Sequence, residues 1–478
     1  MRSLRSLRFS RRTDIPPQNE EVVLGSEVGE PHQTGIAKLA EMIDNRYVLS
    51  DCRIALAPIG SIRATRFEVF WLLGEGVKRR CLQAGTRKEY SPVVNRDSCM
   101  ASKTPRCESE VPITHMSAWY TSTMEVRALG ATGIQAPIVG IGCWAIGGPA
   151  FNLDQPMGWS TANDDESRAG LAYAYENGVR LFDTADVYGL GKSERLLGEL
   201  VDSVDRESLV LVSKTGYFAG TSRHAYERLH MRHQLEQTLE NLRTDYIDIY
   251  FFHHNNFGVG GEYLQGALDF MENAQAQGLV RNFGMRGPHR YALERGKPYA
   301  AQNKTALFSH IAEQIRPKVI TLRDNLLTPR EKTEGLYTWA KDHDCGVIVN
   351  KPLGQGLLTG KYVDPIQFAP GDHRSRKTWF QEPQLGVVRA AIDEIRQLAN
   401  LNQEQLVGLA FWHCLSSYNN AVVLTGFTKV EQLQVNLSDT ALSAPDSSVL
   451  ELARRVLGEA QETLDRLGDM HVNKEHKS

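Results

Sequence analysis

Short apolar runs alternate with amphipathic stretches along the last three quarters of the chain, from Met124 onward. Eight of these runs are short and rich in β-branched residues, which is typical of buried strands. The predicted strands are 138–144, 180–183, 209–213, 246–252, 280–284, 318–323, 346–350 and 421–425. Apolar positions between them follow a helical period, and predicted helices include 164–177, 192–203, 224–243, 263–277, 331–343 and 387–400.

This alternation predicts an α/β fold with a parallel sheet. Strands that read as continuous apolar runs are covered on both faces, and parallel neighbours are joined by right-handed helical crossovers. Eight such units in about 310 residues fit a closed (β/α)8 TIM barrel. The alternative is an open doubly wound sheet, which is disfavoured because no G-x-G-x-x-G motif follows the first strand.

The first part of the chain has a different pattern. In residues 1–115, apolar runs such as IALAPIG stand between charged and turn-forming stretches without a regular period. We therefore predict an N-terminal extension over 1–115 that is poorly ordered, followed by the barrel over 116–478. A small accessory domain in 1–115 stays open as an alternative.

Composition narrows the class of protein. The 478 residues carry a net charge of −3, and no apolar run approaches the ~18 residues of a membrane span. We expect no membrane insertion, no nucleic-acid partner and no metal site, because neither a basic stripe with aromatics nor a metal-ligand spacing is present. Seven cysteines without a framework indicate a reducing, cytoplasmic location. Residues 1–12 are basic, so organelle targeting is a second option.

Three predicted strands end in titratable side chains. Asp183, Lys214 and His253 end the second, third and fourth strands. The carboxyl ends of barrel strands form one face, and active sites of this fold lie there. We therefore expect these three side chains to lie close together.

Several ordered motifs around these residues resemble one family. FDTADVYG at 182–189 is followed by GKSERLLGEL, and LENLRTDYIDIYFFH ends at His253. Together with Ser213-Lys214 and KPLGQGLLTGKY at 351–362, they resemble the aldo-keto reductases over about 124–440. The resemblance implies an NADP(H)-dependent oxidoreductase that interconverts a small aldehyde or ketone and its alcohol.

The resemblance also implies a role for each residue of the site. Tyr188 is expected to be the proton donor, and Lys214 should lower its pKa from the ordinary ~10. Asp183 would hold Lys214, and His253 would orient the substrate carbonyl, although the neighbouring His254 could do this instead. Trp144 would line the substrate pocket, with Trp159 and Tyr217 as further candidates.

Two glycine-containing segments resemble the family's cofactor loops. Backbone without side chains can approach a pyrophosphate closely, and a helix start favours an anion. Lys429 near a helix start favours NADP over NAD. The predicted cofactor residues are Pro352, Leu353, Gly354, Gly356, Gly360, Lys361, Gly426, Thr428, Lys429, Gln432, Asn436 and Arg286.

The chain departs from the family pattern where the nicotinamide would lie. Arg286-Gly287 stands in place of Ser-Asn, Thr321 in place of glutamine, and Asn350 in place of an aromatic residue. This leaves a second hypothesis, a catalytically slow cofactor-sensing or regulatory barrel. A different reaction at the same site, such as isomerisation, is a third.

Overall fold

The computed structural model describes residues 124–152, 155–288 and 304–468. The predicted extension over 1–115 lies outside the described residues. Eight parallel strands close into a barrel in the order β3-β6-β7-β8-β9-β10-β11-β12, and β12 pairs with β3. This closure confirms the predicted (β/α)8 barrel and excludes the open doubly wound sheet.

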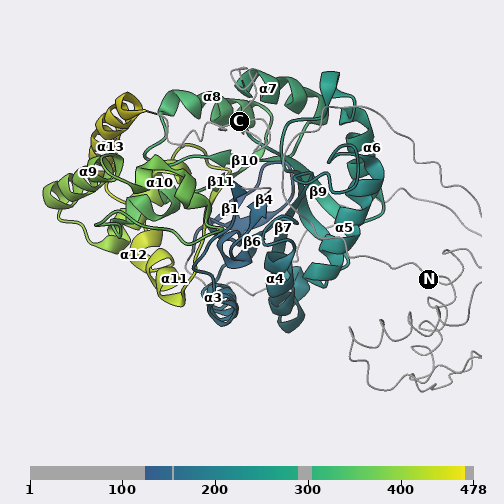
Figure 1. Ribbon diagram of the computed structural model, residues 1–478, viewed down its shortest axis with the longest axis horizontal. Coiled ribbons are helices and arrows are strands. Elements are labelled where there is room, and N and C mark those ends of the chain that lie inside the picture. The colour runs from purple at the N-terminus through teal and green to yellow at the C-terminus, as the bar shows by residue number, and fades with distance from the viewer. Residues whose placement is uncertain (1–123, 153–154, 289–303, 469–478) are drawn as a thin grey trace, which may run out of the picture. The chain divides into compact units, whose positions relative to one another are not determined.

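Each predicted barrel strand is present, with small shifts at its ends. Their bounds are β3 Val139–Gly142, β6 Leu181–Asp183, β7 Val210–Thr215, β8 Ile247–Phe252, β9 Val280–Arg286, β10 Val319–Arg323, β11 Gly346–Asn350 and β12 Ala421–Thr425. The apolar runs form strands because both faces are buried, one toward the barrel interior and the other toward the surrounding helices (Figure 1).

The described helices surround the strands (Figure 1). Their bounds are α3 Asp164–Glu176, α4 Lys192–Ser203, α5 Arg228–Leu242, α6 Leu264–Ala276, α7 Lys304–Ile315, α8 Glu334–Asp342, α9 Gln384–Ala399, α10 Gln403–Leu415, α11 Val430–Asn436, α12 Asp439–Leu442 and α13 Ser447–Leu467. Helix α10 has no amphipathic period in the sequence, because its apolar residues lie on almost every side, and it was not among the predicted helices. Within the described ranges, no helix is long and apolar enough to cross a membrane.

A hairpin plugs the amino-terminal end of the barrel. Strands β1 (Val126–Ala128) and β2 (Gln135–Pro137) pair antiparallel, and Leu129 from their turn is fully buried. Leu129 packs with inward-facing side chains of the barrel strands, among them Val319 and Ile348. The lower barrel is therefore a filled apolar core, and the opposite end is left for polar groups.

The pleat of the strands also explains why polar side chains reach the site. Successive side chains of a strand point to opposite faces, so residues two apart share a face. The inward positions run from apolar to polar in three neighbouring strands: Leu181 then Asp183, Val212 then Lys214, and Phe251 then His253. The same two-residue period that fills the core thus directs three polar side chains to the upper mouth.

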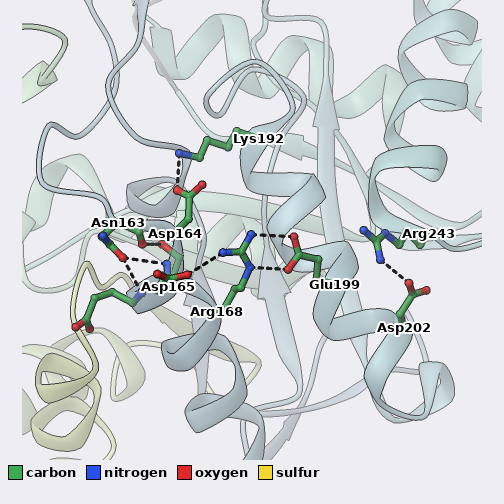
Figure 2. Close-up of polar contacts among 10 residues, drawn as sticks. Asn163, Asp164, Asp165, Arg168, Lys192, Glu199, Asp202 and Arg243 are labelled. Carbon is green, nitrogen blue, oxygen red and sulfur yellow. Dashed lines mark hydrogen bonds and ion pairs between the residues drawn. The ribbon is translucent and has the colours of Figure 1, made fainter. Parts of the chain in front are cut away.

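Surface ion pairs connect α3 and α4 on the outside (Figure 2). Arg168 pairs with Asp165 at 3.1 Å and with Glu199 at 2.6 Å, and Lys192 pairs with Asp164 at 2.6 Å. Pairs that are this exposed contribute only about 0–1 kcal/mol each. Packing of the helices on the barrel therefore fixes their position more than these charges do.

Candidate active site

Asp183 and Lys214 form a buried ion pair at the mouth of the barrel. Lys214 Nζ lies 2.7 Å from both Asp183 carboxylate oxygens and donates to the Thr184 carbonyl oxygen at 2.6 Å. Both side chains are about 5% exposed. Burial opposes the charge of Lys214, but the Asp183 carboxylate raises its pKa above the ordinary lysine value. The ammonium is therefore held charged and fixed in place.

Tyr188 lies in the loop between β6 and α4, against the loop that follows β3. Its neighbour Gly189 has a φ of 61°, and a Cβ there would lie 2.1 Å from the Gly147 carbonyl oxygen. Only glycine permits this close approach, which brings Tyr188 over the barrel mouth. The Tyr188 ring centroid lies 5.1 Å from Lys214 Nζ and 6.0 Å from the His253 ring centroid.

The Lys214 ammonium lowers the pKa of Tyr188, as expected, but the net shift of that pKa is upward. Burial raises the pKa of Tyr188, and this outweighs the opposite effect of the Lys214 ammonium. Asp183 raises it further, while Arg286 lowers it. Tyr188 is therefore held as the protonated phenol, which is the form that can donate a proton.

The structure separates the two candidate histidines. His253 lines the cavity, with its ring centroid 4.9 Å from that of Tyr217. The backbone of His254 exchanges hydrogen bonds with the Tyr226 hydroxyl, and its ring packs on that of Tyr226 away from the cavity lining. Burial, Arg286 and Lys214 lower the pKa of His253 well below the ordinary value. His253 is thus the neutral imidazole beside Tyr188.

A hydrogen-bond network behind the site, which the sequence pattern did not predict, fixes the loop that carries Tyr188. Ser193 Oγ donates to the Cys143 carbonyl oxygen at 2.7 Å. The buried Glu194 carboxylate accepts hydrogen bonds from Ser213, Thr238 and Asn241 at 2.8–3.0 Å. These contacts join α4 to the strand that carries Lys214. In the sequence, this network is marked only by the Ser-Glu pair of GKSERLLGEL, which is Ser193 and Glu194.

The upper end of the barrel opens into a cavity of about 640 Å³. This is the usual size of a small-molecule or cofactor site. The four proposed catalytic residues and Trp144 line it. Of the predicted cofactor residues, those that line it are Pro352, Leu353, Gly356, Lys361, Gly426, Thr428, Gln432, Asn436 and Arg286.

Three predicted cofactor residues lie outside this lining, namely Gly354, Gly360 and Lys429. The two glycines have positive φ angles and shape the turn around Gly356. Lys429 is exposed and precedes α11, so it lies beside the cavity. The first N–H group of that helix, at Val430, donates to Glu166 at 3.2 Å. The predicted anion position at this helix start is therefore partly taken by a carboxylate of the protein.

The residues that depart from the family pattern converge on the same cavity. Arg286, Gly287, Thr321 and Asn350 all line it. A Cβ at Gly287 would lie 2.6 Å from the Thr321 carbonyl oxygen, so the backbone leaves no room for the missing asparagine side chain. The altered residues therefore form one connected surface.

Two loops make the outer wall of the cavity, and the first of them carries Trp159, a predicted pocket residue. The Asp372 carboxylate joins them, since it accepts from Ser160 in one loop and from Arg374 in the other, at 2.7–3.0 Å. The His373 ring packs 4.2 Å from that of Trp144, and the Arg374 guanidinium lies 4.1 Å from the Trp159 ring. The sequence therefore predicted one residue of this wall, Trp159, and assigned no role to the basic run HRSRK.

We expect Asp372→Asn to loosen this wall. Arg374 would lose its charged partner, and a buried donor left unsatisfied costs about 1–3 kcal/mol. Hydrogen–deuterium exchange of the amides in 155–160 and 371–377 should rise, while exchange in the barrel strands stays unchanged. Asp364→Asn, at an exposed position before the same wall, is the control. Unchanged protection in the Asp372 variant would show that apolar packing alone holds the loops.

The described part of the chain contains no set of side chains that could bind a metal ion. No group of three or more His, Cys, Asp or Glu side chains there is arranged to hold a metal ion. The three described cysteines, Cys143, Cys345 and Cys414, are buried and free.

Known proteins share both the sequence pattern and the fold. Aldo-keto reductase YhdN of Bacillus subtilis is 27% identical over 316 residues, which cover 65% of this chain and 87% of that protein. The NADH-specific methylglyoxal reductase of Escherichia coli is 26% identical over 361 residues, covering 72% of this chain and all of that protein. The structure of the glycerol dehydrogenase AKR11B4 from Gluconobacter oxydans superimposes with a TM-score of 0.55 at 20% identity, covering 70% of this chain and 95% of that one.

The sequence model of the Aldo/keto reductase family matches residues 139–454. This range contains all eight barrel strands, the Asp183–Lys214 ion pair, Tyr188, His253 and both cofactor loops. The chain belongs to the aldo/keto reductase family of oxidoreductases.

Proposed function

We propose that this protein is an NADP(H)-dependent oxidoreductase that reduces a small aldehyde or ketone to its alcohol, or catalyses the reverse reaction. One observation carries the proposal: the Tyr188 ring lies close to both the Lys214 ammonium and the His253 ring, and all three side chains line one cavity. A protonated phenol in this place is suited to donate a proton to a carbonyl oxygen.

The cavity fits a dinucleotide cofactor in its chemistry. Gly356 and Gly426 bring bare backbone to its wall, and Lys361 adds a positive charge there. Gln432 uses its carbonyl oxygen to accept from the Thr428 N–H group, which leaves its amide N–H groups for a ligand. The buried Thr321 hydroxyl also lines the cavity and has no hydrogen-bond partner among the described residues.

When bound, the reduced nicotinamide supplies the hydride. The protein then has to place the carbonyl and supply the proton. Tyr188 Oη donates the proton to the carbonyl oxygen, and Lys214 stabilises the negative charge that the phenol leaves behind. Asp183 keeps Lys214 charged and in position. His253 is neutral, so it orients the carbonyl by hydrogen bonding and does not compete as the acid.

A titration of the full chain with NADPH and with NADH, followed by a panel of aldehydes and ketones, tests this proposal. Tight binding of NADPH and steady oxidation of it by at least one carbonyl compound support the reductase. The second candidate, a cofactor sensor, is favoured by the altered residues Arg286, Gly287 and Asn350 in the cavity wall. It predicts cofactor binding without turnover across the panel.

Lys429 tests the choice between the two cofactors. Lys429→Gln should weaken NADPH binding by roughly 1–3 kcal/mol, the scale of a charged hydrogen bond, and should affect NADH much less. The measurement is a fluorescence titration with both cofactors. Lys341→Gln, an exposed lysine on α8, is the control. Equal losses for both cofactors would mean that Lys429 does not contact the 2′-phosphate.

A further inference from the structure

Arg286 is a cation that faces the site. It is the last residue of β9, and its register partner on β10 is Thr321. Its side chain is partly buried and lines the cavity. Among the described residues it makes no hydrogen bond or ion pair, while the neighbouring Asp183 carboxylate is already bound twice by Lys214.

The register of the barrel places Arg286 next to His253. Phe252 of β8 pairs with Met285 of β9 in parallel, so the next residues along, His253 and Arg286, lie side by side. Of the charged groups that lower the pKa of His253, Arg286 has the largest effect, ahead of Lys214. The guanidinium is therefore close to the ring that orients the reacting carbonyl.

The charge of the cavity wall is consistent with an anionic ligand. Positive side chains in the lining, besides Lys214 and Arg286, are Arg323, Lys351, Lys361, Arg374, Arg376 and Lys377. The acidic side chains in the lining are Asp183 and Glu431. Asp183 is neutralised by Lys214, and Arg374 is paired with Asp372. A concave site with this balance attracts negatively charged molecules.

We infer that Arg286 binds a carboxylate on the substrate, so that the substrates of this enzyme are 2-oxo acids. This inference rests on the proposed reductase function. A guanidinium binds a carboxylate through two parallel N–H···O bonds, and its five donors leave another edge for the nicotinamide. The carboxylate at Arg286 would place the adjacent carbonyl oxygen at His253 and Tyr188.

The reaction then balances as a two-electron reduction. The carbonyl carbon gains the hydride supplied by the reduced nicotinamide, and the electron pair of the C=O π bond moves to oxygen. Tyr188 donates the proton to that oxygen, and the product is a 2-hydroxy acid. The carboxylate itself is unchanged and serves to orient the molecule.

Two matched pairs of compounds test this inference. Phenylglyoxylate and its methyl ester present the same ketone with and without the charge, and reduction is followed as kcat/KM. Oxamate and oxamide have similar shapes, and calorimetry compares their binding to the enzyme saturated with its cofactor. In the parent enzyme, oxamate should bind tightly and oxamide weakly.

Arg286→Met should lower the ratio of kcat/KM for acid over ester by about 100-fold, the scale of charged hydrogen bonds. It should abolish the preference for oxamate, while Arg286→Lys keeps the charge and retains part of both preferences. Arg455→Met removes an exposed cation of α13 outside the lining and should leave both preferences in place. Cofactor affinity is measured for each variant by fluorescence.

The results that would contradict the carboxylate site differ from those that would contradict the reductase function. Reduction of the ester but not of the acid, or equal binding of oxamate and oxamide, overturns the carboxylate site and leaves the reductase standing. Equal loss for acid and ester, together with loss of cofactor affinity in Arg286→Met, would assign Arg286 to the cofactor alone. Failure to reduce any carbonyl compound overturns the reductase as well.

Discussion

Replacing Tyr188 with phenylalanine is expected to slow carbonyl reduction by about 10²–10⁴-fold, the usual contribution of a positioned acid. The change removes the hydroxyl but keeps the ring and its packing against Trp144, whose centroid lies 6.0 Å away. Cofactor affinity should change little. The rate should be measured in a single turnover, so that cofactor release does not mask the chemical step.

The pH dependence of the reaction is a second test of Tyr188 as the proton donor. Burial raises the pKa of Tyr188, so the phenol is protonated at neutral pH and stays so above the ordinary tyrosine value of ~10. Reduction should therefore be flat through neutral pH and fall only in strong alkali, while alcohol oxidation should increase with pH. Tyr217→Phe makes the same change beside His253 and should cost less than about tenfold. A Tyr188→Phe enzyme with near-parent rates would rule out this donor.

Lys214→Met is expected to reduce both stability and activity. It leaves the Asp183 carboxylate, which is 4% exposed, buried without its counter-charge. Breaking a buried pair in this way costs about 3–5 kcal/mol in the free energy of unfolding. Activity should fall about as far as in Tyr188→Phe, and the two changes together should not multiply, because these residues act as one unit.

The double variant Lys214→Met/Asp183→Leu separates the two effects. It removes both charges, so urea unfolding followed by circular dichroism should show much of the stability restored. Single-turnover reduction should stay as slow as in Lys214→Met alone. If Lys214→Met unfolds at the parent urea concentration, the ion pair contributes nothing to stability. If the double variant regains activity, Lys214 has no part in the proton transfer.

The two-residue and helical periods of the sequence determined the barrel. The eight apolar runs form eight parallel strands because each run is buried on both faces. This condition can be read from each run alone, without knowing which strands lie beside it. The same period determined that Asp183 and Lys214 face inward, since each lies two residues beyond an inward apolar side chain. Each of these residues shares a strand with the apolar side chain two positions before it, so the local pattern is enough to predict which way it faces.

The position of Tyr188 needed more than a pattern. Its place in the sequence, five residues after Asp183, allows many loop conformations. The close approach of Gly189 to Gly147 and the contacts of Ser193 and Glu194 select one of them. The family resemblance indicated the outcome, and the tertiary structure supplies its physical cause.

Burial is the property that only the tertiary structure decided. It raised the Tyr188 pKa by more than Lys214 lowers it, and it packed the ring of His254 on that of Tyr226, away from the cavity. It also built a wall from His373 and Gly158, which are 215 residues apart in the chain. Burial is a sum over contacts between distant segments. A period of two or 3.6 residues reports which face of an element is covered, but not which groups of other elements cover it.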